Sequence, residues 1–295
     1  MKLTHAGAVM LMVLVTLLWS TAGVVTRQLA SVHSFEVSFW RSFFTALGLL
    51  VLLPAWQGRA VFGRVFQGGR ALWLSALCWS VMFSAFMLAL TLTTVANVLV
   101  TLAMGPFLTA IATRLFIGHR LALRTWVSIG VASAGIVWMY AGQADFSTQA
   151  LGIAVALLAP IAGACNWTVV QHSQARGAKT DLVPAVLVGA VLSSLAMLPA
   201  ALPFQATRHD VGLLALLGVF QLAIPCVLAV LCAQVLKAPE VALLALLEVV
   251  FGILLAWWGA GEVPGPHVLV GGLLVIAALV GNELVSWQSG ISNNI

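Results

Sequence analysis

The chain has 295 residues, and only 21 of them are charged, 13 Lys or Arg and 8 Asp or Glu. This share of 7% compares with roughly 25% in a typical soluble domain. With a hydrophobic fraction of 62% and a mean hydropathy of +1.11, the chain carries more apolar surface than a soluble fold of this size can bury. The composition therefore excludes an ordinary cytosolic domain, a disordered chain and a disulfide scaffold, and it indicates an integral membrane protein.

Ten continuous apolar segments follow one another along the chain, each close to the ~20 residues that a membrane-spanning helix needs. Continuous runs of this length disfavour a membrane barrel, whose strands alternate in short segments. Since ten helices use about 200 residues, only short loops remain and no soluble domain is expected. The sequence predicts an all-α fold of ten transmembrane helices, at residues 6–26, 36–56, 71–91, 94–117, 125–142, 151–172, 182–203, 211–235, 239–259 and 266–287.

Basic residues alternate along the chain in a way that orients these helices. With the N-terminus in the cytoplasm, nine Lys and Arg residues lie in cytoplasmic segments, whereas only Arg27 and Arg208 lie in outward loops. Such an excess is typical of cytoplasmic loops in a plasma membrane protein. Both termini are therefore expected in the cytoplasm, and the net charge of +5 reflects topology rather than nucleic-acid binding. The nine residues are Lys2, Arg59, Arg64, Arg70, Arg120, Arg124, Arg176, Lys179 and Lys237.

The two halves of the chain share a common spacing. Gly118 and Gly261, at the ends of the fourth and ninth helices, are 143 residues apart, and the same offset places Gly105-Pro106 opposite Glu248-Val249. Each half then holds five helices, and because five is odd, the second half crosses the membrane upside down relative to the first. Many secondary transporters use such inverted repeats, with the substrate site between them near the midplane. The repeats are expected at residues 1–145 and 146–295.

Several short motifs occur in a characteristic order. They are Leu17-Leu18-Trp19-Ser20, Phe39-Trp40-Arg41-Ser42-Phe43, Ala96-Asn97-Val98-Leu99, Gly105-Pro106-Phe107, the run from Val241 to Phe251, and Gly261-Glu262. In this order the chain resembles the EamA-type branch of the drug/metabolite transporter superfamily, over nearly its whole length. The resemblance implies ten helices in two inverted repeats, and within the family it is greatest to the bacterial amino-acid exporters, including the aromatic amino-acid exporter.

Two positions depart from the family pattern. The family often ends the fourth helix with Gly-Glu, where this chain has Gly118-His119, and it often has Glu-Pro in the ninth helix, where this chain has Glu248-Val249. The sequence therefore gives no support for a carboxylate at the end of the fourth helix or for a proline kink in the ninth.

Glu248 is the only carboxylate expected near the midplane. It lies nine residues into the ninth helix, roughly 13 Å deep. A carboxylate at this depth is expensive and is by default a functional candidate, either for proton coupling or for a substrate ammonium group. The alternative is a structural carboxylate that is hydrogen-bonded to a neighbouring helix.

Arg41 lies five residues into the second helix, roughly 8 Å deep. A guanidinium there can hold a substrate carboxylate through two hydrogen bonds. The alternatives are that it extends outward to the membrane surface or pairs with Glu36.

The remaining candidates for a central cavity are aromatic, polar or flexible side chains within the apolar segments. They serve either a binding site or packing between helices. These candidates are Trp19, Ser20, Trp79, Asn97, Thr101, Met104, Asn166, Trp167 and Gln221. Four further residues allow a hinge or a static kink, namely Gly105, Pro106, Pro160 and Pro225.

No motif indicates catalysis, a metal or a cofactor. Cys78, Cys165, Cys226 and Cys232 lie in apolar runs without a Cys-x-x-Cys pair, and the sequence has no HExxH, GxSxG or Walker A motif. An intramembrane enzyme is thus not predicted, because a nucleophile with a base is lacking.

The sequence therefore predicts a secondary transporter in a lipid bilayer that exports amino acids and similar metabolites by alternating access, the direction being implied by the resemblance alone. A carrier or flippase for drugs or sugar-linked compounds and, less favoured, a passive pore are the alternatives. The oligomeric state is left open.

Overall fold

The computed structural model describes residues 3–26, 28–29, 34–93, 95–118, 121–140, 150–175, 181–260 and 265–292. Gly261, His119, and four of the nine basic residues used above, Lys2, Arg120, Arg176 and Lys179, lie outside this part, as does Arg27. Helices account for nearly all of the described chain, and it contains no strand.

Each expected transmembrane segment forms one helix or a chain of consecutive helices. In the first half these are α1 (His5–Ser20), α2 (Ala22–Thr26), α3 (Ser34–Gln57), α4 (Val61–Gln67), α5 (Gly69–Leu92), α6 (Val95–Leu102), α7 (Gly105–Ile117) and α8 (Leu123–Tyr140). In the second half they are α9 (Ala150–Ala175), α10 (Pro184–Ala201), α11 (Arg208–Leu216), the π-helix η1 (Leu217–Ala223), α12 (Ile224–Cys232), α13 (Ala238–Ala245), α14 (Leu247–Ala260) and α15 (Pro266–Ser292).

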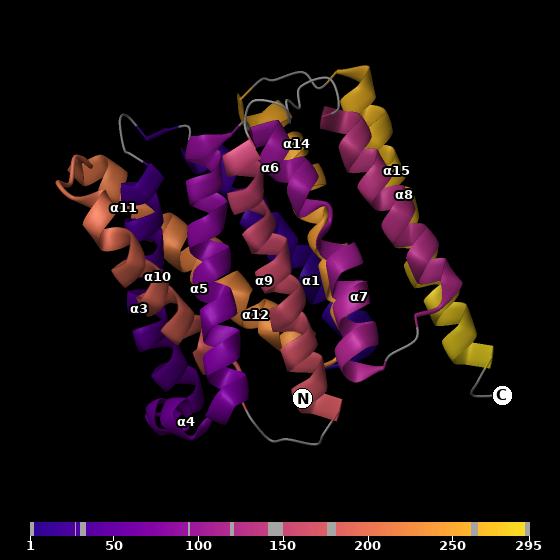
Figure 1. Cartoon of the computed structure of the whole chain (residues 1–295), viewed down its shortest axis with the longest axis horizontal. Helices are drawn as coiled ribbons and strands as arrows, with labels where there is room; N and C mark the ends of the chain where they lie inside the picture. The colour runs from indigo at the N-terminus through magenta and orange to yellow at the C-terminus, as the bar shows by residue number, and fades with distance from the viewer. Residues whose placement is uncertain are drawn as a thin grey trace.

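Eight of the described helical segments are long and apolar enough to cross a membrane. The fifth and tenth expected segments form shorter apolar helices, at Leu123–Met139 and Pro266–Asn282. These two belong to α8 and α15, which pack against each other at one edge of the bundle (Figure 1). The prediction of ten spans and of cytoplasmic termini therefore remains a prediction, while the multi-pass helical architecture is established.

The helices pack in pairs that are repeated when the two halves are exchanged. We match each membrane segment of the first half with the segment five places later in the chain. The packing of α5 against α9 then corresponds to the packing of α1 against α12, and that of α5 against α10 corresponds to that of α3 against η1. Likewise α7 on α9 is equivalent to α1 on α14. The pairs α3 with α10 and α8 with α15 map onto themselves. This is the contact pattern that a pseudo-two-fold axis between two repeats produces.

The fourth and ninth segments are broken at equivalent positions. α6 ends at Leu102 and α7 begins at Gly105, while α13 ends at Ala245 and α14 begins at Leu247, so that the offset of 143 residues superposes the two breaks. Gly105-Pro106 explains the first break, because proline lacks the backbone N–H that would continue the helix. The second break occurs without a proline: the amide of Leu246 bonds the carbonyl of Leu243.

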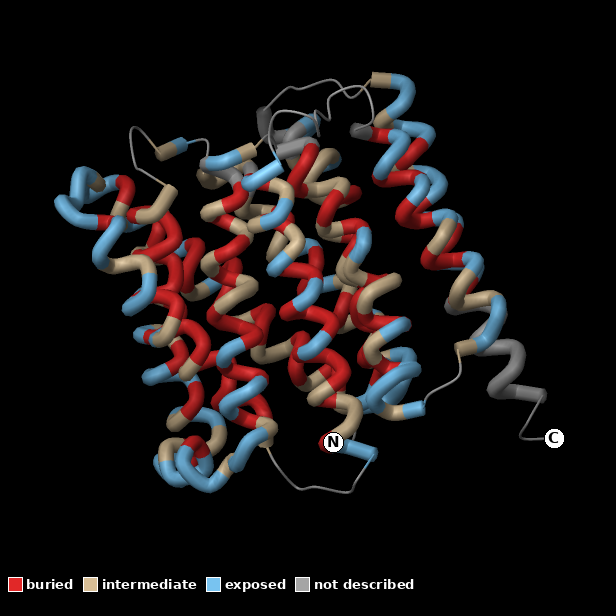
Figure 2. The backbone as a smooth tube through the Cα atoms, viewed as in Figure 1, coloured by how far each residue is buried: buried red, intermediate tan, exposed pale blue. Residues whose placement is uncertain are grey.

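Burial is distributed as expected for a protein in lipid. Buried residues gather where helices face one another, and exposed ones lie on the outer surface of the bundle (Figure 2). The exposed residues include large apolar side chains such as Trp258, which is 89% exposed. Between α8 and α15, Gly135 and Gly271 allow the backbones to touch, since a Cβ on Gly135 would lie 2.8 Å from the Gly271 carbonyl oxygen.

Candidate functional site

The two breaks meet at a central cavity of about 230 Å³. Leu102 and Gly105 border it from one break, and Ala245, Leu246 and Glu248 border it from the other. Segments α1, α3, α5, α9, η1 and α12 complete the wall, so both halves of the chain contribute. Discontinuous helices that meet at mid-depth are the usual location of a transporter's substrate site.

Arg41 provides the positive charge of the cavity wall. It lies on α3 and is only 6% exposed. Its Nη2 donates to Gln221 Oε1 at 2.9 Å and its Nη1 to Met87 Sδ at 2.7 Å, while its buried Nε has no hydrogen-bond partner in the described part of the chain. Arg41 therefore neither extends to the membrane surface nor pairs with Glu36, the two alternatives that the sequence left open.

Glu36 has a different task at the start of α3. Its carboxylate accepts the backbone N–H groups of Gln205 and Ala206, at 3.0–3.1 Å, and the indole N–H of Trp40 at 3.2 Å. Buried polar groups need such partners. Glu36 thus ties the segment before α11 to α3 and does not contribute to the cavity.

Glu248 provides the negative charge of the cavity wall. It follows the second break and lies in the first turn of α14, where the helix dipole favours an anion. Within the described chain its carboxylate forms neither a hydrogen bond nor an ion pair, although it is close enough to Arg41 for electrostatic attraction. A half-buried carboxylate without a protein partner is available to a cation or a proton.

Aromatic rings form much of the remaining wall. The rings of Trp79 and Trp167 meet edge to face, with centroids 5.6 Å apart, and Trp79 also packs on Phe83 at 5.5 Å. Trp19 borders the cavity from α1. The indole N–H of Trp79 is buried and has no hydrogen-bond partner among the described residues.

Five of the predicted cavity residues do not border this cavity. Ser20 donates to the Leu17 carbonyl, Thr101 donates to the Asn97 carbonyl, and the Asn97 side chain donates to Thr93. Asn166 accepts from Ser75 on α5, so it links helices as the alternative held, and Met104 is 46% exposed but does not border the cavity. Trp19, Trp79, Trp167, Gln221 and Glu248 do border the cavity, as do Gly105, Pro106 and Pro160, whereas Pro225 is buried away from it.

The α5 side of the cavity contains residues that were not predicted from the sequence. Met82, Phe83 and Phe86 border it from α5, together with Trp79. Their spacing of three, four and seven residues from Trp79 places all four on one helix face. This spacing could have identified them once Trp79 was singled out.

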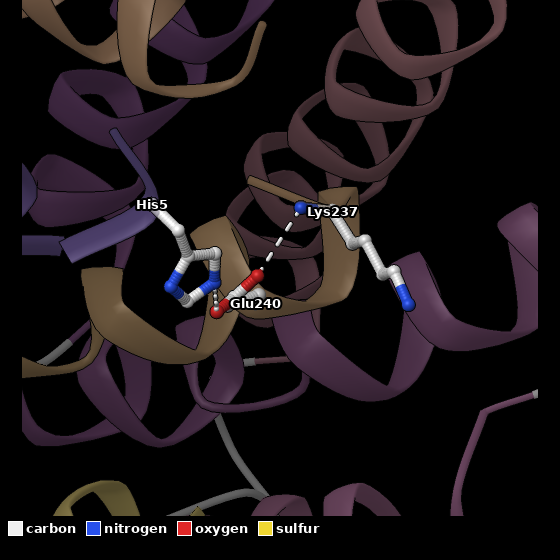
Figure 3. Close-up of polar contacts among 3 residues, drawn as sticks. All are labelled: His5, Lys237 and Glu240. Atoms are coloured by element: carbon white, nitrogen blue, oxygen red, sulfur yellow. Dashed lines mark hydrogen bonds and ion pairs between the residues drawn. The ribbon is translucent and has the colours of Figure 1, made fainter. Parts of the chain in front are cut away.

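A polar cluster joins the helices at the end of the bundle where α1 begins, here called the His5 end. His5 Nε2 lies 2.7 Å from Glu240 Oε1, and the other Glu240 oxygen accepts the Lys237 backbone N–H at 3.3 Å (Figure 3). The Ala238 N–H donates to Gln171 on α9 at 2.8 Å. α13 also packs on α7, so four helices meet at this end.

A membrane bundle built from two related halves, with broken helices meeting at an aromatic cavity, is typical of secondary transporters. Residues 6–141 and 150–283 each match the EamA-like transporter family, and the chain belongs to this family of the drug/metabolite transporter superfamily. It is a membrane transporter.

A solved crystal structure of a protein that is 16% identical in sequence has the same fold, with a TM-score of 0.77 over 96% of this chain and 98% of its own. No curated protein matches the chain in sequence.

Proposed function

We propose that the protein is a secondary transporter that exports amino acids and similar small metabolites across the plasma membrane by alternating access. The main support for this proposal is the charge of the cavity wall. One guanidinium, from Arg41, and one carboxylate, from Glu248, border a small cavity with aromatic walls. An amino acid has the complementary charges on one carbon, and its side chain can lie against the rings.

Charge and size favour this cargo over the alternatives. A sugar-phosphate or nucleotide-linked sugar carries several negative charges, yet Arg41 is the one cation among the described residues of the cavity wall. The cavity volume of about 230 Å³ is below the ~300–1,000 Å³ typical of pockets for drug-sized ligands. A small zwitterion with an apolar side chain suits both limits.

Glu248 is the proposed coupling residue. A single carboxylate that binds either a proton or a cargo ammonium group, but not both, makes the two compete for the cavity. Such competition exchanges protons for cargo. The proposed rocking units are residues 1–145 and 146–295, with the breaks near Pro106 and Leu246 as hinges.

Counterflow in proteoliposomes tests this function. Vesicles loaded with an unlabelled aromatic amino acid should accumulate the labelled amino acid from outside, with saturation and with a dependence on the pH gradient. Linear flux that is not stimulated by internal amino acid would indicate a pore. Saturable counterflow of sugar-linked compounds or drugs, without any of amino acids, would indicate the alternative carrier.

A further inference from the structure

We propose that Gln221 is a positioning residue: the π-helix η1 presents its amide to Arg41 and thereby orients the guanidinium for a carboxylate of the cargo. The inference rests on the proposed function, because it concerns how the same cavity selects a carboxylate.

The backbone around Gln221 is unusual. The Ile224 N–H bonds the Val219 carbonyl five residues back, so the turn that holds Gln221 is wider than an α-helical turn. π-helical turns are rare and often occur at functional sites. An extra residue in the turn rotates the side chains after it relative to those before it, so η1 changes which side chains of this segment face the cavity.

The π-helix η1 packs closely on α3 beside Arg41. A Cβ on Gly218 would lie 2.6 Å from Phe44 Cβ and 2.8 Å from the Arg41 carbonyl oxygen, so only glycine permits this approach. The Thr45 hydroxyl lies 2.7 Å from the Arg41 carbonyl oxygen and 2.9 Å from the Gly218 carbonyl oxygen. These contacts hold the backbones of Gln221 and Arg41 in register.

The hydrogen bonds of the Gln221 amide allow only one orientation of its side chain. Its Oε1 accepts from Arg41 Nη2 at 2.9 Å and its Nε2 donates to the Trp19 carbonyl at 3.2 Å. A guanidinium can only donate and a carbonyl can only accept, so the reversed amide would lose both bonds. Gln221 is 3% exposed, and its side chain is held at both ends.

The contact with Gln221 leaves Arg41 with its charge and with further N–H donors. A guanidinium has five N–H donors, and here one nitrogen binds a neutral amide and one binds a weakly accepting thioether, while the described residues offer no partner to the buried Nε. An amide fixes the orientation of the guanidinium without neutralising its charge, whereas a carboxylate in its place would neutralise it. The charge and the remaining donors are thus kept for a carboxylate bound through two hydrogen bonds.

The test compares phenylalanine with phenethylamine, which lacks only the carboxylate, in the purified full-length protein. Binding is followed by tryptophan fluorescence, since Trp19, Trp79 and Trp167 border the cavity, and transport by counterflow. Gln221→Glu should weaken phenylalanine binding about tenfold or more and raise its KM without a matching loss of maximal rate, while phenethylamine binding is unchanged or stronger. Gln221→Ala should weaken phenylalanine binding less.

Gln57→Glu is the matched control, because Gln57 also accepts from an arginine, Arg64, at 3.2 Å, but outside the cavity. It should leave both ligands unaffected. Equal effects of the Gln221 variants on both ligands, or none on either, would overturn the positioning role. If wild-type protein binds phenylalanine selectively but shows no counterflow, the proposed transport fails and the positioning role stands. If it binds no phenylalanine, both fail.

Discussion

Arg41 and Glu248 give the cavity its chemistry because they are opposite charges held in otherwise apolar surroundings. Intramembrane charges are costly and persist where a partner or a task compensates them. Arg41 has partial compensation from Gln221 and Met87, whereas Glu248 has no hydrogen bond in the described part of the structure. The two residues therefore define different experiments.

Replacing Glu248 should abolish the pH dependence of transport. Glu248→Gln removes the site at which a proton and a cargo ammonium group compete, so the initial rate of counterflow should become independent of pH. Glu248→Asp should retain a pH response at a reduced rate. Asp181→Asn is the control, because that carboxylate pairs with Arg64 at 3.6 Å outside the cavity. A wild-type pH profile in Glu248→Gln would exclude the coupling role.

Replacing Arg41 should cost affinity for the carboxylate of the cargo. A charge-assisted hydrogen bond contributes about 1.5–3 kcal/mol, so Arg41→Ala should raise the KM for an aromatic amino acid roughly 10- to 100-fold. Arg41→Lys keeps the charge but loses the planar fork, and its KM should lie between the two. Competition assays with the decarboxylated amine provide the reference. A KM for the amino acid that stays at the wild-type value in Arg41→Ala would contradict carboxylate binding there.

At the scale of elements, the breaks and the π-helix decide which residues meet. Hydropathy located the transmembrane segments, because in lipid a helix must satisfy its own backbone and remain apolar along its whole length. The same property hides helix rotation: when every face is apolar, no pattern tells whether Asn97 or Asn166 points into a cavity or to a neighbouring helix. Arg41 and Glu248 were identifiable because a charge in an apolar segment is conspicuous.

Local backbone irregularities were less accessible to sequence reasoning. The break before Gly105 is encoded by Pro106, which cannot donate a backbone hydrogen bond. The break at Leu246 carries no comparable residue. The π-helix at Leu217–Ala223 ends just before Pro225, which has no N–H to bond the Gln221 carbonyl, but a proline alone does not tell a π-helix from a simple kink. For this reason Gln221 could be named as a candidate but its contact with Arg41 could not.

Gly218 should be the glycine of this segment that tolerates substitution least. In Gly218→Ala the added methyl meets Phe44 and the α3 backbone, which should destabilise the protein by about 1–3 kcal/mol, as overpacking does. In the same membrane segment, a Cβ added to Gly212 would meet no described residue within 4 Å beyond its own stretch of helix. Gly212→Ala should therefore leave the protein unchanged or slightly more stable. Thermal unfolding in detergent measures both, and equal melting temperatures would contradict the tight contact of η1 with α3.

At the scale of the whole molecule, the packing around the two breaks departs from the pseudo-symmetry. In the two repeats α7 is equivalent to α14, and α6 is equivalent to α13. The pair of α7 and α13 therefore has a symmetry-related counterpart, the pair of α14 and α6. The first pair is in contact, but no comparable packing joins the second within the described residues. α13 also packs on α9, whereas among the described residues its counterpart α6 has no comparable packing on α1. Around the breaks, the helices are thus packed more closely at the His5 end than at the other, and the opposite state follows if the halves exchange these conformations.

This asymmetry predicts which side of the membrane reaches the cavity. Thr109→Cys, in a variant without the four native cysteines, places a thiol on the cavity wall. A membrane-impermeant thiol reagent should label it faster from the face opposite the His5 end, which is the periplasmic or external face if both termini are cytoplasmic. Adding His5→Ala removes the 2.7 Å contact with Glu240, weakens the more closely packed end, and should raise labelling from the His5 side several-fold. Intact cells and inside-out vesicles separate the two faces, and a cysteine at exposed Phe66 controls for the orientation of the vesicles. Faster labelling from the His5 side in the protein with His5 intact would show that its resting state faces the other way.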